Sequence, residues 1–109
     1  MFEVEDYLSP EGFDPYADWL ASLADRQAKA RVLVRVLRMG AGNFGDCKAL
    51  SDGVWELRID HGPGYRVYYA QAGKSLILLL AGGDKRKQKA DIAIAIDRWN
   101  DWQQRKKAP

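Results

Sequence analysis

The sequence has one cysteine and one histidine among its 109 residues, and these shortages exclude several kinds of site. The single cysteine, Cys47, cannot form an internal disulfide and is typical of a reducing compartment. One histidine and one cysteine, with no closely spaced acids of ligand type, do not provide a zinc or calcium site. No serine lies in a nucleophile-elbow pattern, so a serine hydrolase is not indicated. We expect no metal and no cofactor.

Long apolar runs are missing as well. No segment approaches the ~18–20 apolar residues of a membrane-spanning helix. The acidic start, residues 1–8, lacks the basic and then apolar pattern of a signal peptide. We therefore expect a cytoplasmic protein without membrane contact. The length of 109 residues predicts one domain with one core, residues 1–109. Its basic end, residues 103–109, is expected to be a frayed tail.

The two signs of charge are nearly balanced overall, at +2, but they are unevenly distributed. Residues 1–47 hold five Lys/Arg and eight Asp/Glu, a balance of −3. Residues 48–109 hold twelve Lys/Arg and seven Asp/Glu, a balance of +5. A basic half suits a polyanionic partner such as RNA, although a solvated surface produces the same asymmetry.

Three strand-like runs between residues 53 and 83 organise the chain. They are Val54–Asp60, Tyr65–Ala70 and Ser75–Ala81, and the Gly-containing breaks HGPG and QAGK separate them. Runs of this length, rich in β-branched and aromatic residues, predict an antiparallel meander. The last run is apolar almost throughout, so we expect a central strand that is covered on both faces.

Alternation along the first two runs assigns side chains to the faces of this sheet. The apolar positions of the first run, Trp55 among them, should face the core. Glu56 and Arg58 then lie on the open face, and Arg66 of the second run joins them if it points to the same side. The sheet would thus carry a charged cluster on a rigid platform.

Helices should flank the meander. Residues 2–8 favour a short opening strand. Asp14 and Pro15 are suited to be the N-cap and the first residue of a helix over residues 15–23. Apolar residues at helical spacing over residues 92–102 predict a final helix. The expected fold class is α+β: an N-terminal strand, two helices, a three-stranded antiparallel meander and a C-terminal helix.

The second helix of this set should begin after Asp25, its N-cap, and run to about Met39. Ala30, Leu33 and Leu37 recur at helical spacing, so we expect them to form its buried stripe.

Basic residues gather on this second helix and after the meander. Arg31, Arg35 and Arg38 line one outer face of the helix within about 60°. Residues 82–89 hold four more cations, just where the last helix begins. The arginines are either a solvated helix face or a row of phosphate contacts.

The charged cluster on the sheet has the chemistry of an anion site, with one carboxylate among cations. Arginines stabilise a pentavalent phosphate through forked hydrogen bonds, and Glu56 can accept a proton. These groups suit RNA cleavage without a metal, in which the ribose 2′-hydroxyl attacks its own phosphate. An ordinary ion-pair lattice on a sheet has the same composition. Chemistry alone leaves both readings open.

Ordered blocks of sequence point to a family. They read W-L-A-S-L-A-D (19–25), R-V-L-x-R (31–35), G-N-F-G-D-C-K (42–48), G-V-W-E-L-R-I (53–59), G-P-G-Y-R-V-Y-Y (62–69) and L-L-L-A-G-G-D-K (78–85). With these blocks the chain resembles the RelE/ParE toxin superfamily, and more narrowly its HigB-like "addiction module killer" branch, over roughly residues 16–102.

The resemblance implies the same α+β fold, with a curved antiparallel meander, and the toxin half of a type II toxin–antitoxin system. It implies a helix-turn-helix (HigA-like) antitoxin as partner. Many members of the superfamily cleave mRNA in the ribosomal decoding site without a metal. The expected function is therefore a metal-free, ribosome-dependent mRNA endonuclease, with the ribosome and mRNA as further partners.

The resemblance also suggests roles for single residues. Arg66, within G-Y-R-V-Y, falls on the recurrent arginine of the catalytic face and is expected to bind phosphate. Lys85 and Arg86 fall on the basic turn that reaches the scissile phosphate. Glu56 and Arg58 occupy positions where other members place lysines, so Glu56 is either a base or an orienter of Arg58. The expected catalytic set is Glu56, Arg58, Arg66 and Lys85.

The expected RNA-binding residues share a positive charge and lie outside that set: Lys48, Arg31, Arg35, Arg38, Arg86, Lys87 and Lys89. The chain departs from some mRNA-cleaving relatives at Ile92, where they carry a tyrosine. Two other functions therefore stay open: a toxin without nuclease activity that binds a protein such as gyrase, and an inactive RNA-binding member of the fold. Trp99 and Trp102 belong either to the core or to an antitoxin surface.

Overall fold

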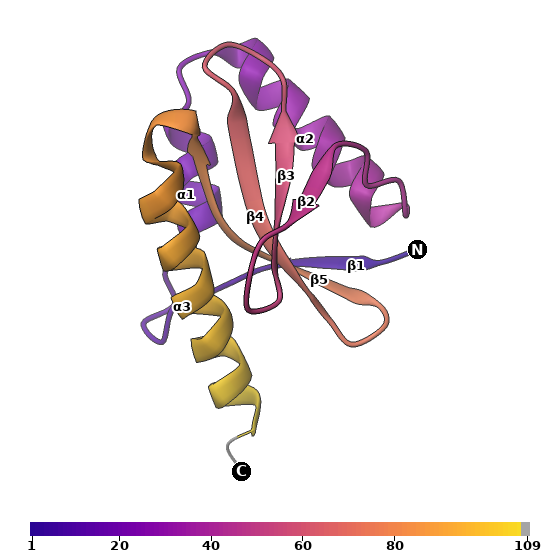
Figure 1. Cartoon of the computed structure of the whole chain (residues 1–109), viewed down its shortest axis with the longest axis vertical. Helices are drawn as coiled ribbons and strands as arrows, with labels where there is room; N and C mark the ends of the chain where they lie inside the picture. The colour runs from indigo at the N-terminus through magenta and orange to yellow at the C-terminus, as the bar shows by residue number, and fades with distance from the viewer. Residues whose placement is uncertain (108–109) are drawn as a thin grey trace.

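In the computed structural model, which describes residues 1–107, a five-stranded sheet has helices on both faces (Figure 1). The strands are β1 (Glu3–Asp6), β2 (Cys47–Ala49), β3 (Val54–Ile59), β4 (Tyr65–Ala72) and β5 (Leu76–Asp84). The helices are α1 (Pro15–Ser22), α2 (Arg26–Gly40), the short 3-10 helix η1 (Lys85–Lys87) and α3 (Gln88–Lys107). The predicted α+β class and the order of its elements are confirmed.

The sheet has the strand order β1-β5-β4-β3-β2. The predicted meander is its centre, because β3, β4 and β5 pair antiparallel in sequence order. The opening strand β1 extends the sheet by pairing parallel to β5. Strand β2 was not expected; its three residues pair antiparallel to β3 and form the other edge.

Both predicted N-caps are confirmed by their hydrogen bonds. An Asp14 carboxylate oxygen accepts from the Ala17 backbone N–H at 2.9 Å at the start of α1. Asp25 accepts from the Gln27 N–H at 2.9 Å and from the Ala28 N–H at 3.2 Å at the start of α2. These caps satisfy amide groups that the first helical turn leaves without a partner.

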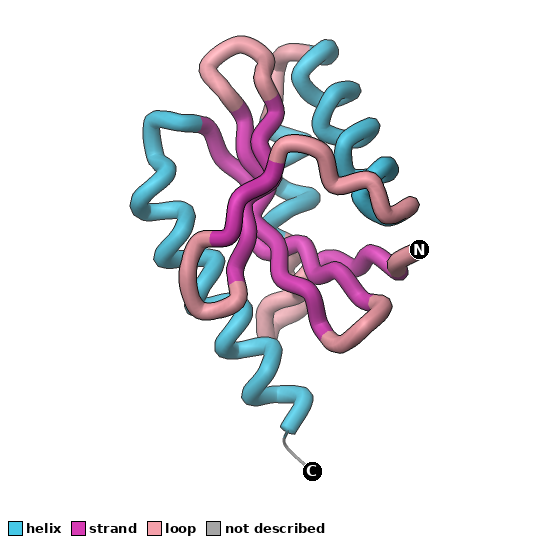
Figure 2. The backbone as a smooth tube through the Cα atoms, turned by 45° about the vertical axis from the view of Figure 1, so that its right-hand side comes forward, coloured by secondary structure: helices cyan, strands magenta, loops and turns pink. Residues whose placement is uncertain are grey.

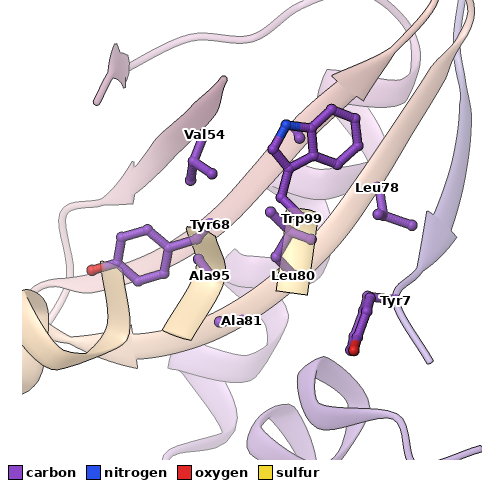
Figure 3. Close-up of a cluster of buried hydrophobic side chains, with 9 residues drawn as sticks. Tyr7, Val54, Tyr68, Leu78, Leu80, Ala81, Ala95 and Trp99 are labelled. Atoms are coloured by element: carbon purple, nitrogen blue, oxygen red, sulfur yellow. The ribbon is translucent and has the colours of Figure 1, made fainter. Parts of the chain in front are cut away.

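The expectation of one open sheet face is wrong, because each face is covered. Helix α3 covers one face, where Tyr68, Leu80, Ala95 and Trp99 pack together (Figure 3). Helices α1 and α2 cover the other face, over side chains such as Leu57. The alternating residues of the central strands therefore enter two cores, not one core and solvent.

One tryptophan of β3 is also placed differently from the prediction. Trp55 was expected in the core but is 39% exposed. Its ring stacks on Tyr69 with centroids 6.5 Å apart. Trp55 is opposite Ala49 of the short edge strand β2, a small neighbour that offers little cover to an indole ring.

Helix α2 is rotated relative to the prediction. Its buried residues are Ala28, Val32 and Met39, and not the expected Ala30, Leu33 and Leu37. The helix carries two apolar stripes, and the sheet covers the one that sequence periodicity did not favour.

The C-terminal segment is helical where a frayed tail was expected. Helix α3 runs to Lys107, so the expectation of a frayed tail is wrong for residues 103–107. The last two residues of that expected tail, 108 and 109, lie outside the described part of the chain. Trp99 is 7% exposed and stacks on Trp102 at 5.5 Å, which makes both tryptophans part of the packing between α3 and the sheet. No helix within residues 1–107 is long and apolar enough to cross a membrane.

Candidate functional site

A groove of about 470 Å³ lies at the end of the sheet where the β3–β4 turn and the end of β5 meet. It is lined by polar and turn residues: Asp46, Arg58, Ile59, Asp60, Gly62, Pro63, Gly64, Arg66 and Lys85. Arg58 and Arg66 are directly opposite each other in the β3–β4 ladder. The Lys85 N–H donates to the Gly64 carbonyl at 3.0 Å, which ties the end of β5 to the turn. Three of the four expected catalytic residues therefore share one groove.

Glu56, the fourth, lies beneath the groove at 1% exposure. Its Oε1 is 3.2 Å from Arg66 Nε and 3.9 Å from Arg58 Nε. Its Oε2 accepts a hydrogen bond of 2.9 Å from Gln88 Nε2 at the start of α3. A carboxylate this deeply buried holds the two arginines in position and does not reach a ligand in the groove.

Arg66 combines a fixed inner side with a free outer end. Its side chain is 13% exposed. Nε is buried and lies 3.2 Å from Glu56 Oε1 in an ion pair without a hydrogen bond in the described chain, and Nη1 donates to the Gly64 carbonyl at 3.3 Å. Nη2 makes no hydrogen bond or ion pair within residues 1–107. The guanidinium is therefore pre-oriented, with donors left for an anion in the groove.

Arg58 is held from its other side by a loop carboxylate. Asp46 Oδ1 accepts from Arg58 Nε at 3.2 Å and from Nη2 at 3.0 Å. Arg35 fixes this loop from α2, because its guanidinium donates to the carbonyls of Phe44 and Asp46, both at 3.1 Å, and to that of Arg58. Arg35, expected to contact RNA, thus has its donors engaged by the protein.

The basic turn after β5 divides into paired and free cations. Arg86 Nη2 lies 2.7 Å from Asp84 Oδ2, and Asp84 also accepts from the Arg86 N–H at 2.9 Å. The Arg86 side chain, together with that N–H, holds the pKa of Asp84 below its usual value. Lys85, Lys87 and Lys89 are exposed and make no ion pair within the described residues. They are the cations of this turn that remain available to a polyanion.

A second hollow, of about 570 Å³, adjoins the groove along α2. Arg31, Arg35 and Arg38 line it, and it shares Ile59 and Asp60 with the groove. Arg31 and Arg38 are exposed. The predicted arginine row on α2 therefore continues the cationic surface of the groove.

Lys48 stands apart from these two hollows. It lies on the edge strand β2, opposite Glu56 in the ladder, and it is exposed. It does not line the groove.

Sequence reasoning missed three residues of the site. Asp46 pairs with Arg58, Asp60 lines the groove without an ion pair in the described chain, and Gln88 holds Glu56. Asp46 stands within the G-N-F-G-D-C-K block, so its place in a motif was a usable signal. No local pattern links Gln88 to Glu56, because the two are 32 residues apart.

The start of α3 supplies no exposed phenol. Ile92, at the position where some relatives carry a tyrosine, packs against the core beneath α3. The Tyr68 hydroxyl is buried and has no hydrogen-bond partner in the described chain. Burial, followed by the nearby Glu56 charge, raises the pKa of Tyr68. Within residues 1–107, no three His, Cys, Asp or Glu side chains gather in a way that could hold a metal ion.

Comparison with known proteins gives two matches. Residues 18–100 match the family described as "Phage derived protein Gp49-like (DUF891)". An uncharacterized protein of Haemophilus influenzae (strain ATCC 51907 / DSM 11121 / KW20 / Rd) is 48% identical over 80 residues, which are 73% of this chain and 81% of the relative. The family match begins within α1 and ends within α3, and it includes the whole groove.

Proposed function

The chain belongs to the family of Gp49-like phage-derived proteins, and we propose that it is the toxin of a type II toxin–antitoxin system. In this proposal it is a HigB-like member of the RelE/ParE superfamily that cleaves mRNA on the ribosome without a metal, and an antitoxin neutralises it. The family supports the toxin role, and the groove is the observation that carries the nuclease role.

The groove offers groups that suit a phosphate in the act of cleavage. When a 2′-hydroxyl attacks the adjacent phosphorus, negative charge grows on the non-bridging oxygens. Arg66 can meet these oxygens with oriented N–H groups, and Lys85 adds a point charge at the rim. Donors that are already in position stabilise the transition state without reorganising, which is the largest single contribution in many enzymes.

Glu56 serves in this scheme as a positioning residue. Its burial keeps it from the substrate, while its oxygens fix Arg66 and approach Arg58. Of the two carboxylates that line the groove, Asp46 is bound to Arg58 and Asp60 makes no ion pair within residues 1–107. Asp60 is therefore the groove's candidate acceptor for the 2′-hydroxyl proton.

The test is to map RNA 5′ ends in cells that express the chain without antitoxin. Wild type should produce new 5′ ends inside translated codons, and these should disappear when ribosomes are blocked. Arg66→Ala should abolish them. Lys74→Ala, which removes an exposed cation from the β4–β5 turn at the other end of the sheet, is the matched control and should leave them unchanged.

Other outcomes would replace the proposal. Growth arrest without new ends would point to a toxin that binds a protein target such as gyrase. Neither arrest nor new ends, with RNA binding intact, would indicate an inactive RNA-binding member of the fold.

A further inference from the structure

Helix α2 exposes an apolar stripe that nothing in the described chain covers. Leu33 is 50% exposed, Val34 43% and Leu37 75%. Ala30 lies among them and is also exposed. At 100° per residue these four positions span a sector of roughly 100° on the side away from the sheet, the width by which an amphipathic helix usually buries itself.

The stripe continues into a hollow beside the N-terminus. This hollow, of about 430 Å³, lies between α2 and β1. Leu33, Leu37, Val4 and Met1 line it with almost no polar surface. Figure 2 shows the start of the chain next to the C-terminal end of α2, and the Phe2 N–H donates to the Gly40 carbonyl at 2.7 Å. We call this apolar stripe and the adjoining hollow together the α2 surface.

The charges on helix α2 itself have one sign. Residues 26–40 contain five Lys/Arg and no Asp or Glu. Arg35 is turned inward to backbone carbonyls. The remaining four make no ion pair within residues 1–107: Arg26, Lys29, Arg31 and Arg38. Two acids lie beside this helix: Asp25, its N-cap, pairs with His61, and Asp60 lines the hollow that holds Arg31.

This pattern selects one class of partner. A second copy of the chain would bring a second α2 with the same cations against the first, and like charges at an interface are unfavourable. A nucleic acid would gain nothing from the aliphatic centre. A helix with an aliphatic seam and acidic flanks complements both the centre and the rim.

We propose that the α2 surface binds an amphipathic, acidic helix of a partner protein. Leu33 and Leu37 are the apolar anchors, and the cations of α2 meet the acids on the flanks of that helix. The inference rests on the proposed function, in which the antitoxin is the protein that supplies the helix.

The surface chemistry can be tested with purified chain and designed helical peptides. The probe is an 18-residue peptide with leucines along one seam and glutamates on both flanks. Two matched probes carry lysines in place of the glutamates, or serines in place of the leucines. We expect the acidic Leu peptide to bind at least tenfold more tightly than either, by titration calorimetry, and to shift the amide resonances of residues 30–38.

Two variants test whether the peptide binds through the apolar side chains of this surface or only through general charge attraction. Leu33→Gln/Leu37→Gln should reduce binding of the acidic Leu peptide at least tenfold. Both side chains are solvent-exposed, so the helix content and the unfolding midpoint should stay unchanged. Ile94→Gln, which removes an aliphatic side chain of similar exposure from α3, should bind as wild type does.

A second arm uses the product of the neighbouring reading frame, which the proposed function makes the antitoxin. Leu33→Gln/Leu37→Gln should still arrest growth, but co-expression of that product should no longer relieve the arrest. If co-expression relieves the growth arrest by the variant as fully as the arrest by wild type, the inference fails and the toxin function stands. If wild type alone does not arrest growth, the toxin function fails, and the peptide experiment still decides the surface.

Three results would overturn the inference: equal binding of the acidic and basic peptides, binding that Leu33→Gln/Leu37→Gln does not weaken, or no binding at all. A concentration-dependent dimer in sedimentation that the same variant abolishes would assign the surface to a second copy instead.

Discussion

A glutamate at 1% exposure cannot touch a substrate in the groove, so the chemistry of Glu56 acts through the residues it holds. One oxygen faces Arg66, and the other accepts from Gln88. The carboxylate therefore links β3, β4 and the start of α3 at a single buried point. The charge that it neutralises is the one that, in the proposed function, the groove presents to phosphate.

Replacing Glu56 by Gln should separate positioning from proton transfer. The amide keeps the size but loses the charge that compensates Arg66, so the free energy of unfolding should fall by about 1–3 kcal/mol. Misplacement of the Arg66 donors should slow mRNA cleavage by about 10²-fold. Urea unfolding and cleavage rates in a reconstituted translation system measure the two effects.

The pH dependence of the cleavage rate of Glu56→Gln distinguishes a positioning role of Glu56 from a role in proton transfer. A positioning residue lowers the cleavage rate by the same factor at every pH. If Glu56 were the proton acceptor, its loss would remove the acidic limb of the wild-type profile, and our assignment would be wrong. Asp60→Asn is the matched variant: it removes the candidate proton acceptor, so it should slow cleavage while leaving stability within ±0.5 kcal/mol.

Asp6 gives the fold a dependence on pH far from the groove. Burial, a hydrogen bond with Asp14 and the Asp14 charge raise the pKa of Asp6 from 3.8 to about 7. Between these two values the folded chain holds a proton that the unfolded chain has lost. The stabilisation is therefore fully present below about pH 4 and is lost as the pH rises toward 7.

Asp6→Asn should remove this dependence. Wild type should become less stable to urea between pH 4.5 and 7.5, and the variant should show a flatter profile and higher stability at pH 7.5. Glu5→Gln, at the exposed neighbouring position, is the control and should follow wild type. An unchanged slope in Asp6→Asn would mean that other groups cause the pH dependence.

At the scale of elements, two glycines let helices approach β5 closely from opposite faces. A Cβ atom on Gly82 would overlap the Trp19 ring of α1, and one on Gly83 would overlap the Asp91 carboxylate of α3. Gly83 is also opposite Arg66 in the β4–β5 ladder. The close approach of α3 at this point therefore sets the distance over which Gln88 reaches Glu56.

Gly83→Ala should push α3 away and cost about 1–3 kcal/mol of unfolding free energy. Because the overlap is with one side chain, adding Asp91→Ala should recover most of that loss, and Asp91→Ala alone should cost little. The three variants form a double-mutant cycle by urea unfolding. Additive effects would show that the strain lies in the strand itself.

Helix α2 shows why periodicity fixes an element but not its orientation. Ala28, Val32 and Met39 make one apolar stripe, and Leu33 and Leu37 lie on the other. Both stripes satisfy a 3.6-residue period, so local pattern cannot tell which one meets the sheet. The stripe that contains Leu33 and Leu37 was predicted to be buried, and the structure leaves it exposed.

Across the whole molecule, the features that depend on local sequence patterns were predicted, and those that depend on contacts between distant residues were not. The caps at Asp14 and Asp25 and the meander follow from turn and alternation patterns, and they are confirmed. The covering of both sheet faces depends on where α3 packs, which no local pattern encodes. Burial of Glu56 follows from that same packing, so its place in the site could be predicted but its inaccessibility could not.

The two cationic hollows predict a long footprint for a single RNA strand. The groove and the hollow along α2 share Ile59 and Asp60, so a strand that contacts Lys85 in the groove can reach Arg31 in the hollow by crossing this short boundary. For single strands, log affinity falls with log salt concentration by about 0.7 for each neutralised phosphate.

Lys85→Ala/Lys87→Ala/Lys89→Ala should therefore reduce the salt slope by about 2, and Arg31→Ala/Arg38→Ala by about 1.4. Fluorescence anisotropy with a 2′-O-methyl RNA, which cannot be cleaved, measures the slopes, and Lys74→Ala should leave them unchanged. A slope that Arg31→Ala/Arg38→Ala does not alter would confine RNA to the groove. If both slopes fall as expected, the arginines that bind RNA also border the apolar stripe of α2. An acidic helix docked there would then compete with RNA for the same charges, which gives neutralisation a direct physical basis.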